Sequence, residues 1–269
     1  MKLGVVVPVF NEVSQLAGTI ERLRQLLLEQ HFPHWQITIA NNASTDGTHE
    51  LAEDLCKQYG NVRLIHLDEK GRGRALKKVW LESEADILTY MDVDLSTDLS
   101  AYVPLVESLT SGQFDLAVGS RLLAASQTNR GFKRESISRG YNWLVKAFFH
   151  TRFSDAQCGF KAITRQAAQE LLPLVEDTGW FFDTELLVLA EKLGYRICDL
   201  PVRWTDDPDS RVKIVPTAID DVKGLIRVWR NFKQGKYPAN REHLVELRNA
   251  TSSSVARTGN PRPAVQGRS

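Results

Sequence analysis

Two aspartates one residue apart, Asp92 and Asp94, are the residues of this chain best placed to do chemistry. They follow the apolar run 87–91, which predicts a buried strand. The carboxyl ends of parallel strands form the binding crevice of an open sheet, so both carboxylates are expected there. Oxygen ligands of this type suit Mg²⁺ or Mn²⁺ and leave coordination places for a substrate diphosphate. We therefore predict a metal site at Asp92 and Asp94.

Polar residues also follow the other strands that the sequence predicts. The turn 41–48, rich in Asn, Ser, Thr and Asp, suits a base and a ribose. The segment 70–75 combines glycines, which allow close backbone approach, with cations for phosphate ahead of a helix start. Because successive parallel strands end at one edge, these groups are expected to face one crevice. The five predicted strands of this first half are 3–9, 36–40, 62–67, 87–91 and 115–119.

The elements that position these groups alternate along the chain. Strands alternating with amphipathic helices predict an α/β fold with a mostly parallel sheet and helices on both faces. The alternation loosens after residue 119, and from 238 the chain turns polar, so we expect one domain over 1–237 and a disordered tail over 238–269. The predicted helices are 14–30, 48–59, 73–83, 99–109, a helix near 184–193 and 217–234, with further strands at 159–164 and 196–202.

Composition excludes several classes of protein. A net charge of +1 gives no general preference for nucleic acid, and the 42% hydrophobic and 25% charged residues are typical of soluble globular proteins. The three cysteines are widely spaced and lack metal-ligand spacing, which favours thiols in a reducing compartment. No apolar run has the length of a transmembrane helix, and no signal peptide is evident. We expect a cytoplasmic protein.

An ordered set of four motifs runs along the chain: Pro-Val-Phe-Asn-Glu at 8–12, Asn-Ala-Ser-Thr-Asp-Gly-Thr at 42–48, Asp-Val-Asp at 92–94 and Gly-Ser-Arg at 119–121. In this order the motifs resemble those of the family 2 glycosyltransferases of GT-A fold, over roughly residues 3–235. Two further segments, 155–161 and 180–185, are similar to the branch that makes polyprenyl-phosphate sugars, the dolichyl-phosphate glucosyl- and mannosyltransferase type. The resemblance implies an inverting hexosyltransferase that uses a nucleotide-diphosphate sugar and Mg²⁺ or Mn²⁺.

The resemblance also implies roles for single residues. Asp94 is expected to be the principal metal ligand, Asp155 to lie near the reacting centre, and Arg121 to face the diphosphate. Arg139 and Lys161 are expected to face the acceptor phosphate. The residues expected to bind the nucleotide sugar are Pro8, Phe10, Glu12, Asn41, Asp46, Arg72 and Asp92.

Two positions depart from the family pattern. The family usually has an aspartate at the place of Asn41, where it accepts a hydrogen bond from the base, so the preferred nucleotide, UDP or GDP, stays open. Some mannosyl relatives have a metal-binding glutamine at the place of Ser96. The serine weakens the mannosyl interpretation and favours a glucosyl group or another sugar.

The acceptor decides whether a general base is needed. A lipid phosphate is already ionised at neutral pH, whereas a sugar hydroxyl must lose a proton, and Asp155 is the best candidate base for that reaction. The structural alternative for Asp155 is a turn that caps the following strand. The rival functions are transfer to a soluble sugar or polysaccharide hydroxyl and non-catalytic binding of a nucleotide sugar.

A lipid acceptor requires a surface that faces the membrane. Segment 130–152 mixes basic residues with aromatics, and Ile137, Tyr141, Leu144 and Phe148 share one helical face; helix 217–234 has a similar stripe. Such helices suit the headgroup region of an anionic membrane, or alternatively pack on the protein's own sheet. We expect a peripheral protein at the inner face of the membrane, with a homo-oligomer or a membrane-protein partner left open.

Overall fold

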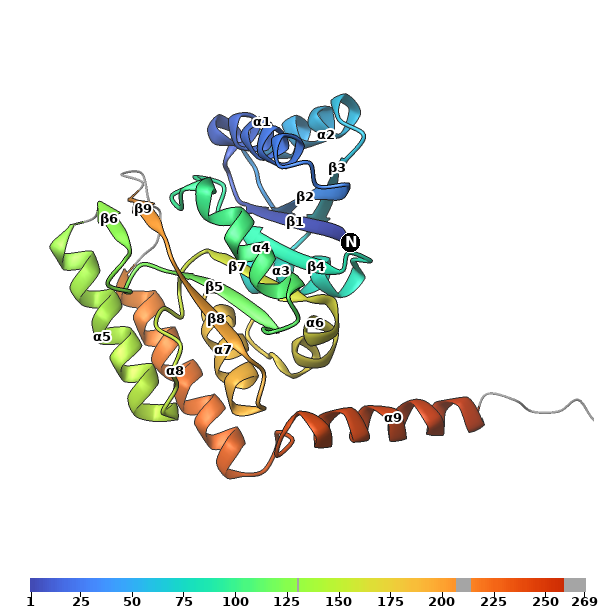
Figure 1. Ribbon diagram of the computed structural model, residues 1–269, viewed down its shortest axis with the longest axis vertical. Helices are drawn as coiled ribbons and strands as arrows, with labels where there is room; N and C mark the ends of the chain where they lie inside the picture. The colour runs from blue at the N-terminus through green and yellow to red at the C-terminus, as the bar shows by residue number, and fades with distance from the viewer. Residues whose placement is uncertain (130, 207–213, 259–269) are drawn as a thin grey trace, which may run out of the picture.

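A computed structural model describes residues 1–129, 131–206 and 214–258. The strands are β1 (Lys2–Val9), β2 (His34–Asn42), β3 (Val62–Leu67), β4 (Ile87–Met91), β5 (Leu116–Ser120), β6 (Gln127–Asn129), β7 (Phe160–Thr164), β8 (Ile197–Pro201) and β9 (Arg203–Thr205). Within the described residues they form a seven-stranded sheet of order β3-β2-β1-β4-β7-β5-β8 and a small sheet that pairs β6 with β9 (Figure 1).

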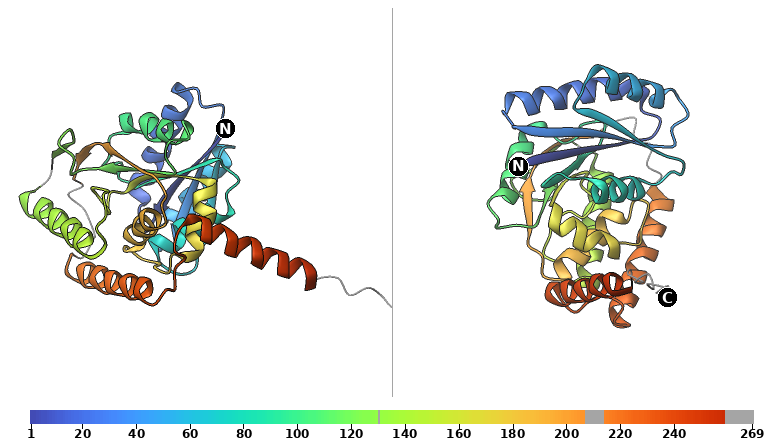
Figure 2. Two further views of the ribbon diagram at one scale, coloured as in Figure 1. Left: turned by 60° about the horizontal axis from the view of Figure 1, so that its bottom comes forward. Right: turned by 90° about the vertical axis from the view of Figure 1, so that its right-hand side faces the viewer.

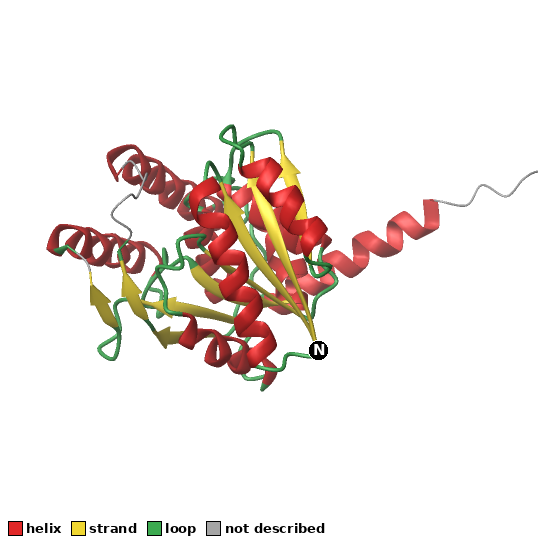
Figure 3. Ribbon diagram, turned by 90° about the horizontal axis from the view of Figure 1, so that it is seen from above, coloured by secondary structure: helices red, strands yellow, loops and turns green. Residues whose placement is uncertain are grey.

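Helices cover both faces of the large sheet, as the sequence predicts (Figure 3). Helices α1, α2 and α4 pack on one face, and α3 with α5–α8 pack on the other. Their bounds are α1 (Val13–Glu29), α2 (Thr48–Gln58), α3 (Arg72–Glu82), α4 (Tyr102–Thr110), α5 (Phe132–Phe149), α6 (Arg165–Leu171), α7 (Phe182–Lys192), α8 (Ile214–Lys233) and α9 (Arg241–Thr258), with short 3₁₀ turns η1 (Leu99–Ala101) and η2 (Leu172–Leu174).

The central strand β1 shows why its sequence is a continuous apolar run. Val5 and Val7 point into the core under α1 and α2, whereas Val6 points into the core under α3. Successive side chains of a strand face opposite sides of the sheet, so a strand covered on both sides needs apolar residues at every position. The predicted bounds of β3 and β4 coincide with the observed ones.

Strand β7 runs against its neighbours. It pairs antiparallel with β4 and with β5, while the other pairs of this sheet are parallel. Met91, the last residue of β4, lies opposite Phe160, the first residue of β7. The segment that leads into β7 therefore reaches the edge at which β1, β2 and β4 end.

The prediction of a disordered C-terminal tail is wrong over α9, which is helical. The start of this helix is held by ion pairs, since Arg241 Nη1 lies 3.0 Å from Asp115 Oδ1 and Arg241 Nε lies 3.1 Å from Glu170 Oε2. Leu244, one turn later, is buried. The helix then extends away from the body of the protein (Figure 1), and residues 259–269 lie outside the described part.

Helices α5 and α8 lie side by side at one end of the molecule (Figures 1 and 2). They correspond to the two segments, 130–152 and 217–234, that the sequence predicts as amphipathic helices; of these, residue 130 lies outside the described residues. In the part of the chain that is described, no helix has both the length and the apolar character required to cross a membrane.

Candidate functional site

The two aspartates follow β4 directly, at the carboxyl edge of the sheet. The backbone N–H of Asp92 donates to Gly159 O at 3.2 Å, and Asp94 Oδ1 accepts from Ser96 N at 2.9 Å. A Cβ atom at Gly159 would lie 1.7 Å from Asp92 Oδ2, so only glycine leaves room for this carboxylate. The strand end and the incoming β7 segment thus fix the position of Asp92.

Arg72 lies next to this pair, in a buried charge network. Its Nη2 contacts Asp92 Oδ1 at 2.8 Å and Tyr90 Oη at 3.2 Å, and its Nη1 pairs with Asp183. The Asp183 carboxylate also accepts from Tyr90 Oη at 2.6 Å and pairs with Lys161 Nζ at 3.1 Å. Burial alone would raise the pKa of Asp183, but the charges of Lys161 and Arg72 outweigh it and hold the pKa below its ordinary value.

Two members of this network, Asp183 and Tyr90, are absent from the residues predicted for the site. Both could have been suspected from the sequence, since each polar group stands among apolar neighbours, in 87–91 and in 180–185. A buried acid needs a cation, but the sequence does not say which one. The partners of Asp183 are supplied by β7 and by the start of α3, far away along the chain.

The two residues predicted to face the acceptor phosphate lie in different surroundings. Lys161 is buried under the network and donates to Cys158 O at 2.6 Å. Arg139 lies on α5 with an exposed side chain, and its Nη2 is 2.8 Å from Glu135 Oε1. The structure therefore does not place them together around one anion.

The two glycines at the start of α3, Gly71 and Gly73, allow close packing. A Cβ atom at Gly71 would lie 2.7 Å from Thr178 O, and one at Gly73 would lie 2.5 Å from the Cβ of Phe182. The backbone N–H of Gly73 donates to Gly179 O at 3.2 Å. The loop thus contacts the segment before α7, which differs from the expected approach of these glycines to a phosphate.

Arg121 and Asp155 form a second buried pair at the end of β5. Arg121 Nε and Nη2 lie 2.7 and 2.9 Å from the two carboxylate oxygens, and the backbone N–H of Arg121 donates to Asp155 Oδ2 at 3.1 Å. Gln157 N donates to Asp155 Oδ1 at 3.2 Å. Burial would raise the pKa of Asp155, but the charge of Arg121 and its hydrogen bonds hold it below its ordinary value. Asp155 is fully buried, in a position to orient Arg121.

The loops after β1 and β2 are joined by hydrogen bonds. Asn11 N donates to Ser44 Oγ at 3.0 Å, and Glu12 N donates to Thr48 Oγ1 at 2.9 Å. Asp46 accepts from the backbone N–H and the hydroxyl of Thr48, at 3.1 and 2.5 Å. Burial alone would raise the pKa of Asp46, but the hydrogen bonds together outweigh it and hold the pKa below its ordinary value. Glu12 and Asp46, both predicted to bind the nucleotide, thus lie in one interlocked pair of loops.

The other predicted nucleotide residues lie at the same edge. Pro8 is buried within β1 opposite Ala40 of β2, and the ring of Phe10 lies 3.6 Å from Lys70 Nζ. Lysine above an aromatic face is a cation–π contact. The predicted pocket for the nucleoside therefore has an aromatic ring and a cation at its rim.

Asn41 is buried between two histidines. Its Nδ2 lies 3.2 Å from Nδ1 of His49 and 3.2 Å from Nδ1 of His66, and its Oδ1 accepts from Ser44 N at 3.1 Å. An amide can donate to both imidazole rings and accept from the backbone, whereas a carboxylate can only accept. The histidine neighbours thus give a physical reason for the amide at this position.

Asp221 on α8 is buried and lacks a compensating cation among the described residues. Its Oδ2 accepts from Gln157 Nε2 at 2.8 Å, and its Oδ1 has no hydrogen-bond partner in this part of the chain. Burial raises its pKa to about 7, and the nearby carboxylates of Asp177, Asp220 and Asp183 add to the effect. This acid links α8 to the segment that holds Asp155.

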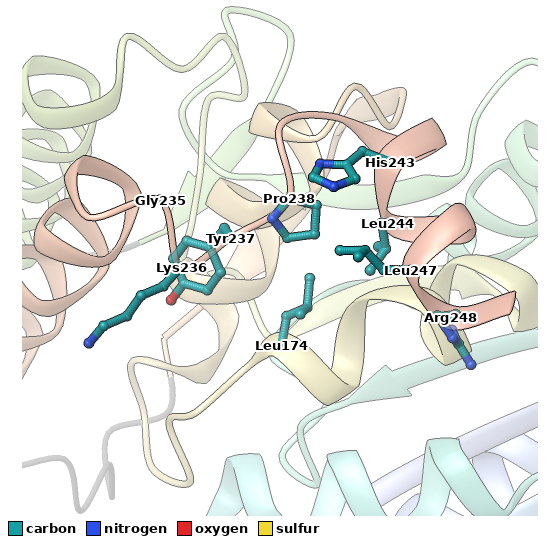
Figure 4. A pocket seen from close by; sticks show the side chains of 9 residues that line it. All are labelled: Leu174, Gly235, Lys236, Tyr237, Pro238, His243, Leu244, Leu247 and Arg248. Carbon is teal, nitrogen blue, oxygen red and sulfur yellow. The ribbon is translucent and has the colours of Figure 1, made fainter. Parts of the chain in front are cut away.

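A surface pocket of about 450 Å³ lies between η2, the turn after α8 and the first turns of α9 (Figure 4). It contains none of the residues predicted for the site. Its lining residues are Leu174, Gly235, Lys236, Tyr237, Pro238, His243, Leu244, Leu247 and Arg248.

Solved structures share the architecture of this chain. Glucosyl-3-phosphoglycerate synthase from Mycobacterium tuberculosis, in complex with Mn²⁺, uridine diphosphate and phosphoglyceric acid, superposes with a TM-score of 0.64. The superposition covers 85% of this chain and 78% of that one, at 17% sequence identity. At such low identity the likeness shows the fold, which is that of GT-A glycosyltransferases.

Characterised relatives are similar over most of the chain. Glycosyltransferase AglD of Haloferax volcanii is 36% identical over 85% of this chain, which spans only 37% of that protein's length. A dolichyl-phosphate beta-glucosyltransferase of Trichomonas vaginalis is 31% identical over 86% of this chain and 71% of its own length. The corresponding enzyme of Saccharomyces cerevisiae is 26% identical, over 89% and 78%. The profile of glycosyl transferase family 2 matches residues 4–172, and the chain therefore belongs to that family.

Proposed function

We propose that the protein transfers a hexose from a UDP-hexose to a polyprenyl phosphate, with inversion at the anomeric carbon. One observation carries this proposal: Asp92 and Asp94 stand at the carboxyl edge of the sheet, with the guanidinium of Arg72 bound to Asp92. Carboxylates for a cation beside guanidinium groups for phosphate are what a nucleotide diphosphate requires.

The residues present fit a divalent cation. In the described part of the chain, no three His, Cys, Asp or Glu side chains converge, so a cation held by Asp92 and Asp94 would take further ligands from the substrate. Mg²⁺ and similar cations often bind through one or two carboxylates and complete their coordination with substrate phosphates. A bound Mg²⁺ or Mn²⁺ would neutralise the charge that gathers on the departing nucleoside diphosphate.

The second arginine of the site supports an anionic substrate. Both oxygens of Asp155 accept from one edge of the Arg121 guanidinium, through Nε and Nη2, and hold this cation oriented at the end of β5, with its Cζ 4.9 Å from the ring of Trp204. A guanidinium held in one orientation loses less rotamer entropy when it binds phosphate. We infer that Arg121 binds a phosphate of the donor or of the acceptor.

The state of the carboxylates favours a phosphate acceptor over a sugar hydroxyl. Asp155, the candidate base, is fully buried, and its pKa lies below the ordinary value. Asp183 is buried with a lowered pKa as well. A general base works best with a pKa near the operating pH, and these two carboxylates do not meet that condition. A phosphate oxygen attacks without such a base.

The names of the relatives support the same choice. Three of the similar proteins act on dolichyl phosphate as beta-glucosyltransferases, and several solved neighbours hold UDP and Mn²⁺. We therefore favour glucose as the hexose and UDP as the nucleotide. Ser96, in the place of a metal-binding glutamine of mannosyl relatives, agrees with this choice.

The acceptor end of the proposal requires contact with lipid. Tyr141, Leu144 and Phe148 of α5 pack against the core, so the predicted membrane stripe of this helix mostly faces inward. Trp143, in contrast, is 70% exposed. The other large exposed apolar side chains of these two helices are Ile137 on α5 and Ile219, Val222 and Trp229 on α8. We propose that these residues form a membrane-facing surface, which would make the protein peripheral to the membrane.

The test is transfer of label into lipid. The protein is incubated with Mn²⁺, radiolabelled UDP-glucose and undecaprenyl or dolichyl phosphate in detergent, and the organic phase is counted. We expect labelled lipid with the wild type and none with Asp94→Asn. Parallel reactions with GDP-mannose test the choice of donor, and free glycans as acceptors test the rival with a soluble hydroxyl.

Three outcomes contradict the proposal in different ways. Label in a free glycan and none in lipid supports the soluble acceptor. Binding of UDP-glucose without turnover on any acceptor supports a nucleotide-sugar-binding protein. Full activity of Asp94→Asn, or activity that chelators leave unchanged, shows that the metal assignment is wrong.

A further inference from the structure

Trp180 differs from the two aromatic residues that follow it. Phe181 and Phe182 are buried, with 2% and 0% of their surface exposed, whereas Trp180 is 46% exposed. The phenylalanines enter the core under the large sheet. The tryptophan is left at the surface, beside the charged network of the site.

The backbone that carries Trp180 is held in place. Its neighbour Gly179 accepts from Gly73 N at 3.2 Å and donates its own N–H to Asp177 Oδ1 at 2.7 Å. On the other side, Phe182 packs directly on Gly73. The segment is therefore fixed against the start of α3, and Trp180 occupies a defined position.

The indole ring lies over the cation of the site. Arg72 Cζ is 5.0 Å from the centroid of the Trp180 ring and 4.9 Å from that of Tyr90, and Arg72 Nη2 is 2.8 Å from Asp92. Arg72 thus contacts both the Trp180 ring and Asp92, at the edge of the sheet where we propose that the metal binds. Nearly half of the surface of Trp180 remains open at this place.

On the basis of the proposed function, we propose that Trp180 is the platform on which the hexose of the donor stacks. One face of a pyranose presents C–H groups, which carry partial positive charge and pack on the negative face of an aromatic ring. The hydroxyl groups at its rim need polar partners. The terminal nitrogens of Arg72 are bound to Asp183, Tyr90 and Asp92, but the carboxylate of Asp92 is 31% exposed and can accept a hydrogen bond at this place. An isoprenoid chain has no hydroxyl groups to match this acceptor, so the surroundings favour a sugar.

The experiment separates the sugar from the nucleotide. Binding of UDP and of UDP-glucose is measured by titration calorimetry with Mn²⁺ for the wild type, Trp180→Ala and Trp180→Phe. We expect Trp180→Ala to weaken UDP-glucose binding by roughly three- to tenfold and to leave UDP binding unchanged. Trp180→Phe, which keeps an aromatic face, should restore most of the loss. Leu28→Ala, at an exposed apolar side chain on α1, is the control and should change neither ligand.

The outcomes distinguish this inference from the function on which it rests. If the wild type binds neither UDP nor UDP-glucose, the proposed function fails. If the wild type binds both, and Trp180→Ala changes neither or weakens both equally, the sugar platform is refuted. If Trp180→Ala leaves UDP-glucose binding intact but raises the KM for polyprenyl phosphate, the ring contacts the lipid and the inference is also wrong. Circular dichroism of each variant verifies that it is folded.

Discussion

Replacing Asp221 by asparagine should stabilise the protein at neutral pH. An ordinary aspartate has a pKa of 3.8, and burial raises that of Asp221 to about 7. An acid whose pKa is higher in the folded than in the unfolded protein lowers the free energy of unfolding once the pH exceeds the unfolded pKa. This destabilisation grows with pH and is complete above the folded pKa. Each factor of ten in proton affinity is worth about 1.4 kcal/mol, so the full penalty above pH 7 is roughly 4 kcal/mol.

Asparagine removes this penalty but keeps the acceptor for Gln157. Its amide N–H₂ replaces an oxygen that has no partner among the described residues, and an unpaired buried donor costs about 1–3 kcal/mol. The neutral acid bears a similar cost, so the two costs cancel, and the expected net gain is about 4 kcal/mol above pH 7 and none near pH 4. For a chain of this size that gain corresponds to a rise in Tm of about 8–16 °C.

The assay is thermal and urea unfolding of the wild type and Asp221→Asn between pH 4 and pH 8. Asp54→Asn on α2 is the matched control, because the side chain of Asp54 is 72% exposed and its loss should change stability little at any pH. The reasoning is refuted if the difference between wild type and Asp221→Asn does not grow with pH, or if the variant is the less stable protein at pH 8. A parallel measurement of transfer activity shows whether the chain keeps this destabilising acid for its reaction.

Further outcomes follow from the same contacts. Gly159→Ala should displace Asp92 and abolish metal-dependent binding of UDP in calorimetry, with circular dichroism showing a folded protein. Asp155→Asn should lower the free energy of unfolding by about 3–5 kcal/mol in urea, because it leaves the buried Arg121 cation unpaired. Because the pKa of Asp155 is lowered in the fold, its ionised carboxylate stabilises the protein above about pH 4, and this stability is lost as the pH falls further. The free energy of unfolding of Asp155→Asn should therefore decrease less steeply in acid than that of the wild type. An equally steep decrease would contradict the assignment. Trp143→Ser should reduce cosedimentation with anionic vesicles, and unchanged binding would show that α5 is not the docking face.

Much of the fold could be predicted because the spacing of apolar residues along the chain indicates which faces of a strand or helix are buried. The apolar runs of β3 and β4 have the predicted bounds, since each run is ended by polar residues. The direction of β7 could not be predicted, because an apolar run reads the same in a parallel and an antiparallel ladder. The helix α9 was missed for a different reason: its start is held by ion pairs with Asp115 and Glu170, which are distant in sequence.

The residues of the candidate site that follow the strand ends could be predicted from the sequence, whereas the buried contacts beneath them could not. Asp92 and Arg72 belong to polar segments that follow predicted strands, and the structure brings them into contact. The partners of Asp183 and the burial of Asp155 depend on tertiary packing, which the spacing of residues does not encode. A residue such as Lys161 therefore looked like a phosphate ligand in the sequence, although its ammonium group is committed to Asp183.

The antiparallel strand β7 divides the large sheet into two blocks of parallel strands. On one side lie β3, β2, β1 and β4, which are parallel to one another; on the other lie β5 and β8. Every ladder hydrogen bond between these two blocks passes through β7, so each block keeps its own register. The block with β5 and β8, together with the helix α8 that follows it, can therefore diverge in sequence without disturbing the block that carries the loops predicted to bind the nucleotide. Such a division would let one scaffold retain its donor while it exchanges the molecule that receives the sugar.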